Sequence, residues 1–242
     1  MKKLLAALWA FWGFCAFMAV VFVLTIAYAL ILLVGGKQYS MQLVWCNFHY
    51  ASPLLCKLML LKVKVFGVEK ISTTQPYVFV ANHNAQIDII CGASATPQPA
   101  RFLAKAEVKY IPFFGFMVRM LGILVDRKSK ESREKSYRYM AAALQKGESL
   151  FLYPEGTRNR TEAPLKEFKD GAFKVAIMAQ VPVAVQTLLH TRKLNDPRSI
   201  HLWPGTVEVH WAEPIATTGM TMDDLPRLKE MVRAEMLKHL TQ

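Results

Sequence analysis

The side chains best suited to chemistry lie in a short block after a predicted strand, Asn82-His83-Asn84-Ala85-Gln86-Ile87-Asp88. Histidine changes charge closest to neutral pH, so His83 is the natural candidate for a general base. A carboxylate five residues later can meet the imidazole where a loop turns into a helix. Asp88 would then hold the imidazole tautomer and stabilise its protonated form. Taken alone, such a pair is more often two unrelated surface or capping residues.

A second block, Leu152-Tyr153-Pro154-Glu155-Gly156-Thr157-Arg158, also follows a predicted strand directly. Gly156 allows the backbone to turn or to approach a ligand closely, and Arg158 offers a planar fork suited to phosphate. An ordinary β-turn would use Pro-Glu-Gly equally well. The chain carries no Gly-x-Ser-x-Gly elbow, so the sequence indicates no serine nucleophile.

Two further blocks are weaker. Gly122-Ile-Leu-Val-Asp126-Arg127 predicts a strand that ends in two charged residues, which is a common arrangement. Val181-Pro-Val-Ala-Val185 is consistent with a core strand and indicates nothing more. A basic run from Arg127 to Arg138 suits either anionic lipid head groups, an acidic carrier protein, or simply the solvated face of a helix.

The elements that would position these blocks alternate between strands and helices. Strands are predicted at residues 76–81, 101–104, 122–125, 149–153, 181–188 and 206–211. Helices are predicted at residues 87–95, 131–146, 171–180 and 223–240. This alternation predicts an α/β fold with a central mixed sheet flanked by helices. Ligands of such sheets tend to bind beyond the carboxyl ends of the strands, where the His83 block lies.

An apolar segment precedes this domain. Residues 4–34 carry no formal charge, and only Gly13 and Thr25 there fall outside the apolar set. A bilayer-spanning helix needs about 20 apolar residues, and the core of a signal peptide about 7–15, so a membrane anchor is favoured over a cleaved signal. A second stretch, residues 41–61, contains polar residues and Pro53, which would break or kink a helix. It suits a segment at the membrane interface or a core helix equally well. We therefore expect an anchor at residues 1–61 and an α/β domain at residues 62–242.

Composition agrees with this division. The 242 residues carry 30 Lys and Arg against 18 Asp and Glu, a formal charge of +12, and 53% are apolar. That apolar fraction excludes a disordered basic tail, and the positive charge predicts an anionic partner. A membrane-bound nucleic-acid-binding protein would need a recognition motif, and none is present. Four scattered cysteines indicate neither a disulfide scaffold nor a zinc site.

Together the four blocks resemble the glycerolipid acyltransferase family, and within it the enzymes that acylate 1-acylglycerol-3-phosphate. Asn82, His83 and Asp88 match the family motif N-H-x4-D, and Gly122 and Arg127 match Gly-x4-Arg. The third motif, F-P-E-G-T-R, is matched with Tyr153 in place of Phe. Other departures are Asn84-Ala85 where the family has Gln-Ser, and Ala184-Val185 where the fourth motif has a second proline. Lys105, ahead of Ile111-Pro112-Phe113-Phe114-Gly115, matches a further family block, and the resemblance covers residues 62–215.

The resemblance implies the chemistry. A fatty acyl group would pass from acyl-CoA or acyl-ACP to the 2-hydroxyl of lysophosphatidic acid and give phosphatidic acid. His83 would act as general base with Asp88 supporting it, without an acyl-enzyme, a metal or a cofactor beyond the thioester co-substrate. The acceptor site would comprise Lys105, Arg127, Glu155, Gly156, Thr157 and Arg158. The expected partners are these substrates and a phospholipid membrane, with no nucleic acid.

The resemblance also implies a place: a membrane, with the bacterial inner membrane expected and the active site facing the cytoplasm. Two alternatives remain open from the sequence. The first is an acyltransferase that acts on another glycerolipid or lysophospholipid. The second is a non-catalytic lipid-binding protein, against which the intact His83–Asp88 pair argues.

Overall fold

The computed structural model describes residues 2–36, 39–125 and 129–241. Arg127, a candidate for the acceptor site, lies outside the described residues. Seven strands form one sheet in the order β1-β7-β6-β2-β5-β3-β4, and only the β6–β7 pair runs antiparallel. The strands are β1 Leu61–Phe66, β2 Val78–Ala81, β3 Ala100–Lys105, β4 Ile123–Val125, β5 Ser149–Leu152, β6 Val183–Leu189 and β7 Gly205–Trp211. The predicted mixed sheet is confirmed.

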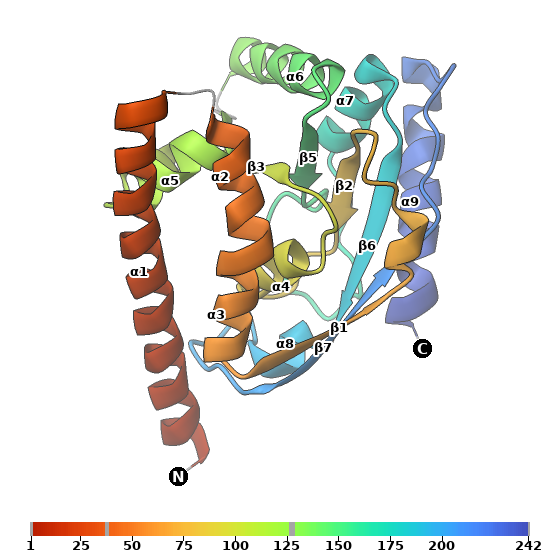
Figure 1. The fold of residues 1–242 in the computed structure, drawn as a ribbon. Coiled ribbons are helices and arrows are strands. Elements are labelled where there is room, and N and C mark those ends of the chain that lie inside the picture. The colour runs from red at the N-terminus through yellow and green to blue at the C-terminus, as the bar shows by residue number, and fades with distance from the viewer. Residues whose placement is uncertain (1, 37–38, 126–128, 242) are drawn as a thin grey trace.

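Helices cover both faces of this sheet (Figure 1). Alternate residues of the central strands face opposite sides, as the period of a strand requires. Phe79 of β2 and Phe151 of β5 enter one core cluster, whereas Val78 and Leu150 enter another. The first cluster includes α4 Asp88–Ser94, and the second includes α6 Lys130–Gln145, α7 Gly171–Ala179 and α9 Leu225–Leu240. The short helices α5 Phe114–Leu121 and α8 Thr191–Leu194 complete the α-helices of the domain as described. Three 3-10 turns lie at Val68–Lys70, Ala106–Tyr110 and Met222–Asp224.

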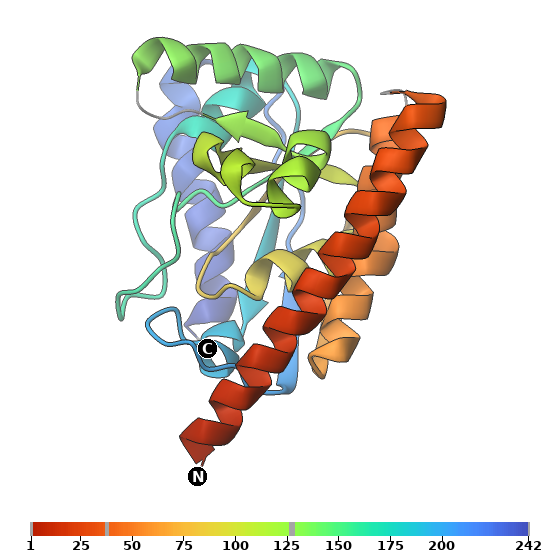
Figure 2. The same ribbon diagram turned by 90° about the vertical axis from the view of Figure 1, so that its left-hand side faces the viewer.

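Two long helical segments lie side by side against the first core cluster (Figures 1 and 2). Helix α1, Lys2–Gly35, is about 50 Å long at 1.5 Å per residue, more than the roughly 30 Å hydrocarbon core of a bilayer. It is the one described helix long and apolar enough to cross a membrane, a judgement from length and composition alone. The second segment comprises α2 Ser40–Cys46, a π-helical turn Asn47–Ala51 and α3 Ser52–Leu58.

The second segment runs through Pro53 without a break. The proline occupies the first turn of α3, where its missing N–H costs least, and the π-helical turn directly before it absorbs the change of geometry. Phe48 and Leu55 enter the core below the sheet, while Tyr50 and Leu54 are exposed. One face of the segment is therefore a core helix, and the other remains available to an interface. The boundary at residue 61 stays a prediction.

Side-chain hydrogen bonds attach α1 to the rest of the molecule at both ends. The indole Nε1 of Trp12 donates to the Leu58 carbonyl at 2.9 Å, and that of Trp9 donates to the Met59 carbonyl at 3.3 Å. These are carbonyls at the end of α3, which have no partner within the helix itself. Farther along, the Tyr28 hydroxyl donates to the Leu43 carbonyl at 3.2 Å. Helix α1 therefore packs against the domain along its length.

Candidate active site

The His83 block, the Glu155 block and Lys105 meet at one edge of the sheet. β2 pairs with β5 and β5 with β3, all in parallel, so the carboxyl ends of these three neighbours point the same way. His83 follows β2 by two residues, Glu155 follows β5 by three, and Lys105 is the last residue of β3. The sheet therefore brings together residues that lie far apart in the sequence, at the edge where α/β sheets bind ligands.

His83 and Asp88 form a hydrogen-bonded pair. The imidazole Nδ1 lies 3.0 Å from Asp88 Oδ2, and Asp88 is fully buried. The same carboxylate oxygen accepts the backbone N–H groups of Asn84 and Ala85, each at 2.6 Å. Asp88 begins α4, where a carboxylate is favoured by the helix dipole and by free N–H groups. The loop-to-helix turn predicted from the spacing is therefore present, and it leaves Nε2 as the ring nitrogen turned away from Asp88.

Glu155 holds the backbone of this loop. Its Oε1 accepts the His83 N–H at 2.7 Å, and its Oε2 accepts the Lys166 N–H at 2.9 Å. The side chain is only 1% exposed. Burial raises the pKa of the Glu155 carboxyl, and these two backbone hydrogen bonds oppose that rise. Both carboxylate oxygens are engaged inside the protein, which makes Glu155 a brace for His83; its predicted part in acceptor binding stays a prediction.

Two asparagines fix the strand ends on either side. The Asn82 side chain exchanges two hydrogen bonds with the Leu188 backbone of β6, at 3.0 and 2.7 Å. The Asn159 N–H donates to the His83 carbonyl at 2.6 Å. Asn82 and Asn159 are both fully buried, so these contacts are shielded from competing water. The backbone around His83 is therefore held at its N–H, at its carbonyl and at the preceding residue.

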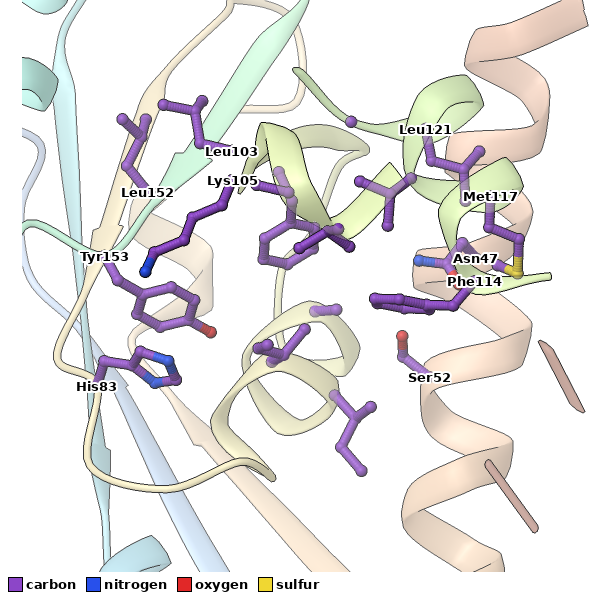
Figure 3. Close-up of a pocket in the computed structure, with 18 of the residues that line it drawn as sticks. Asn47, Ser52, His83, Leu103, Lys105, Phe114, Met117, Leu121, Leu152 and Tyr153 are labelled. Carbon is purple, nitrogen blue, oxygen red and sulfur yellow. The ribbon is translucent and has the colours of Figure 1, made fainter. Parts of the chain in front are cut away.

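A cavity of about 880 Å³ opens from the His83–Asp88 pair toward the helical pair. Figure 3 shows His83, Tyr153 and Lys105 at one end, and Phe114, Met117 and Leu121 of α5 at the other. Apolar side chains from α1, α2, α4 and α5 line most of it, among them Phe17, Val21, Leu24, Val44, Ile90, Met117 and Val118. A long, apolar cavity that begins at a general-base candidate suits a flexible hydrocarbon chain whose reacting end must reach His83.

The polar end of the cavity carries an excess of cations. Gly156, Thr157 and Arg158 line it together with Lys105, as the sequence predicts. Gly156 adopts a positive φ of 74°, which explains a glycine at this turn. Arg160 and Lys166 also line it and were not predicted. The Lys166 ammonium donates to Thr157 Oγ1 at 2.8 Å. This end of the cavity suits a phosphate group.

The cavity wall contributed by α1 could not be predicted from the sequence. Residues 4–34 are apolar all round, so no stripe marks the side that faces the domain. Lys166 and Arg160 lie in a loop without periodicity, and only their charge and their distance of a few residues from Arg158 could have pointed to them. Within the described part of the chain, no group of three or more His, Cys, Asp or Glu residues could hold a metal ion.

Comparison with known proteins agrees with this geometry. Residues 62–186 match the family model described as Acyltransferase. The 1-acyl-sn-glycerol-3-phosphate acyltransferase of Saccharomyces cerevisiae is 31% identical over 211 residues, which cover 86% of this chain and 68% of the yeast protein. The human 1-acyl-sn-glycerol-3-phosphate acyltransferase alpha is 30% identical over 179 residues, covering 73% of this chain and 63% of the human protein.

The fold has a close counterpart among solved structures. The crystal structure of PlsC, the 1-acyl-sn-glycerophosphate (LPA) acyltransferase from Thermotoga maritima, superposes with a TM-score of 0.82 at 22% identity. The superposition covers 99% of this chain and 95% of the PlsC chain. The arrangement of the sheet, the flanking helices and the N-terminal helical pair is therefore a shared fold.

Proposed function

Because the chain belongs to the acyltransferase family, we propose that it transfers a fatty acyl group from a thioester to the 2-hydroxyl of lysophosphatidic acid, making phosphatidic acid. The observation that carries this proposal is the His83–Asp88 hydrogen bond at the polar end of a long apolar cavity. The relatives named above, whose names specify 1-acyl-sn-glycerol-3-phosphate as acceptor, support the choice of substrate.

The reaction needs no group beyond the two substrates. His83 Nε2 takes the proton of the acceptor hydroxyl as its oxygen attacks the thioester carbonyl. The tetrahedral intermediate collapses with cleavage of the carbon–sulfur bond, and the thiolate leaves with the proton that His83 has held. Asp88 stabilises the imidazolium that forms between these steps. The acyl donor is acyl-CoA or acyl-ACP, and no metal or cofactor takes part.

The acceptor phosphate binds at the cationic end of the cavity. Arg158 supplies a planar fork, and Lys105 supplies a point charge from the end of β3. Thr157 and the backbone of Gly156 line the same end. Arg127 completes this set in the proposal on the basis of the family motif alone. The acyl chain occupies the apolar end between α1, α4 and α5.

The proposal includes a place at a membrane. Helix α1 presents a long row of exposed apolar side chains, among them Leu5, Phe11, Phe14, Val23 and Leu33. A phospholipid surface would cover this row, and the positive charge of the rest of the chain would favour anionic head groups. We place the active site on the cytoplasmic side of a bacterial inner membrane, where both candidate donors are made.

An acyl-transfer assay tests the proposal. Purified protein in detergent or vesicles is given acyl-CoA or acyl-ACP with lysophosphatidic acid, and free thiol and phosphatidic acid are both measured. We expect turnover in the wild type and a loss of at least 100-fold, the order of a lost general base, in His83→Ala. The control is His201→Ala, which removes a histidine that does not line the cavity and should keep wild-type turnover.

The assay also separates the alternatives. Turnover with another lysophospholipid but not with lysophosphatidic acid would move the protein to a different acceptor within the family. Binding of lysophosphatidic acid without thiol release by either donor would indicate a lipid-binding protein. An active, folded His83→Ala variant would disprove the mechanism while leaving the substrate open.

A further inference from the structure

Tyr153 stands directly over the His83 ring. The two rings stack with centroids 4.2 Å apart and 24° between their planes (Figure 3). The family motif has Phe at this position, and the ring of Phe would stack equally well. The stacking therefore does not require the Tyr153 hydroxyl. Burying this hydroxyl costs free energy, because its oxygen has no hydrogen-bond partner among the described residues.

Among the other buried oxygens in this condition are one of Asp88 and one of Gln186. Asp88 Oδ2 accepts three hydrogen bonds, yet Asp88 Oδ1 accepts none from any described residue. Gln186 Oε1 of β6 is likewise buried without a described donor, although its amide nitrogen donates to the Gly92 carbonyl at 3.2 Å. Buried polar atoms in native proteins nearly always have a partner, either from the protein or from an ordered water.

Gly92 shows that these oxygens converge. A Cβ placed on Gly92 would lie 2.9 Å from Gln186 Oε1 and 3.5 Å from Tyr153 Oη, so both oxygens face one point. Gly92 lies four residues after Asp88 in α4, and residues four apart are neighbours on one helix face. The Tyr153 and Gln186 oxygens therefore lie beside α4 about one turn after Asp88, whose Oδ1 is the third oxygen without a partner.

Their donor and acceptor roles are complementary. A carboxylate oxygen and an amide oxygen only accept hydrogen bonds, whereas a phenol can donate one. Burial first, and then the charge of Asp88, raise the pKa of Tyr153 well above its ordinary value, so its hydroxyl keeps its proton. One donor thus faces two acceptors. A water molecule between them would accept once and donate twice, which satisfies all three groups.

We propose that a buried water accepts a hydrogen bond from Tyr153 and donates to Asp88 Oδ1 and Gln186 Oε1, making Tyr153 a positioning residue that tunes the His83–Asp88 pair. This inference rests on the proposed function for its meaning in catalysis. The water would stabilise the charged carboxylate at Oδ1, while His83 and two backbone N–H groups stabilise it at Oδ2.

The net charge of the His83–Asp88 pair decides how the loss of the water changes its proton affinity. The active pair, a neutral imidazole with a carboxylate, carries a net negative charge, and its protonated form is neutral overall. Without the Tyr153 hydroxyl the water loses the donor that holds it and leaves, so the carboxylate loses its hydrogen bond at Oδ1. That loss destabilises the negative form more, so the pair takes up a proton at a higher pH. Other titratable and cationic groups surround the pair on the neighbouring elements and stay unchanged when only the Tyr153 hydroxyl is removed. They are Glu155 after β5, Cys91 on α4, Cys56 on α3, Lys105 on β3, and Arg158, Arg160 and Lys166 at the cavity mouth.

The test is Tyr153→Phe, which deletes one oxygen and keeps the ring on His83. We expect the acid limb of the kcat/KM profile to move up by about one pH unit, the order expected for a lost hydrogen bond to a charged group, with KM for lysophosphatidic acid unchanged. Tyr139→Phe is the matched control, because it removes a hydroxyl from a side chain on α6 that is 61% exposed. It should leave the profile as in the wild type.

A second readout does not depend on turnover. In protein with isotope-labelled histidine, the His83 ring signals are identified as those absent from His83→Ala, and their pH midpoint is then followed. An upward shift in Tyr153→Phe and none in Tyr139→Phe supports the inference; an unchanged or lowered midpoint overturns it. If the wild type lacks acyl transfer, the proposed function fails, and this titration still decides whether Tyr153 tunes the pair.

Discussion

At the scale of single residues, His83 is held mostly by contacts that do not involve its ring. Its N–H binds Glu155, and its carbonyl accepts from Asn159. The Nδ1 contact with Asp88 and the stacked ring of Tyr153 orient the imidazole itself. Since the backbone contacts fix the position and Asp88 fixes the tautomer, the free ring nitrogen is presented to the cavity in one orientation, as general-base catalysis requires.

Arg158 gives a prediction at this scale. Arg158→Ala should raise KM for lysophosphatidic acid by about 10-fold or more, the order of one lost charge-assisted hydrogen bond, and should change KM for the acyl donor little. Arg158→Lys is the matched variant, because it keeps the charge and loses the planar fork of the guanidinium. Its KM for lysophosphatidic acid should lie between those of the wild type and Arg158→Ala. Initial rates with each substrate varied in turn give both constants. Equal weakening of donor and acceptor would mean that Arg158 supports the fold of the loop and does not bind phosphate.

The sequence could predict part of this site. A histidine and an aspartate in the spacing of a known motif predict their contact, and the structure places them 3.0 Å apart. The use of Glu155 could not be predicted, because a Pro-Glu-Gly turn does not reveal that both carboxylate oxygens point inward to backbone N–H groups. Nor could the spacing show that Tyr153 stacks on His83, since that contact depends on the pairing of β2 with β5.

At the scale of elements, α1 is a wall of the cavity as well as a candidate anchor. Leu24 lines the cavity, whereas its neighbour Val23, about 100° around the helix axis, is 62% exposed. Substitutions at these two adjacent positions therefore separate the two roles. A larger side chain at position 24 would shorten the cavity. The same side chain at position 23 would contact only lipid or solvent outside the protein.

This difference predicts a change in acyl-chain preference. Leu24→Trp should shift the ratio of kcat/KM values toward shorter acyl chains by about 10-fold or more, as expected when a pocket excludes a methylene or two. Val23→Trp should leave the ratio as in the wild type. A series of acyl donors of increasing length, assayed in competition, measures it. A wild-type ratio in Leu24→Trp would place the acyl chain elsewhere.

Some helices and strands were easier to predict from the sequence than others. The strands and helices from β2 to α9 that were predicted are all present, with ends displaced by one or two residues. Three elements were not predicted. They are β1, α5 and α8. Alternating Lys and Val in β1 is a strand signal, but it directly follows an apolar stretch and is hard to separate from it. The run Phe114-Gly-Phe-Met-Val in α5 suits a strand as well as a helix. The π-helical turn before Pro53 has no sequence signature.

At the scale of the whole molecule, charge and apolar surface are unevenly divided. Only Lys2 and Lys3 of the thirty basic residues precede residue 37, whereas most of the exposed large apolar side chains belong to α1 and α2–α3. The molecule thus offers lipid an apolar pair of helices beside a basic domain. Residues of both parts line the cavity, which therefore lies between them.

Tryptophan fluorescence tests this orientation. In vesicles with brominated lipids, a variant that keeps only Trp12, which lies half exposed on α1, should lose most of its emission. A variant that keeps only Trp211, which is 2% exposed in the core below β7, should keep nearly all of its emission. The two variants serve as controls for each other, because both report the same folded protein. Equal quenching of the two would exclude α1 as the lipid-facing surface.

The strand order has a consequence for biogenesis. β1 pairs with β7, and β7 in turn bridges it to the rest of the sheet. During translation β1 must therefore wait for residues 205–211, a delay of roughly ten seconds or more at about 5–20 residues per second. Throughout that time the backbone N–H and C=O groups of β1 have no partner strand. A nascent chain whose α1 is already captured by lipid would spend this interval held at a surface, at low risk of pairing its unfinished edge with another copy.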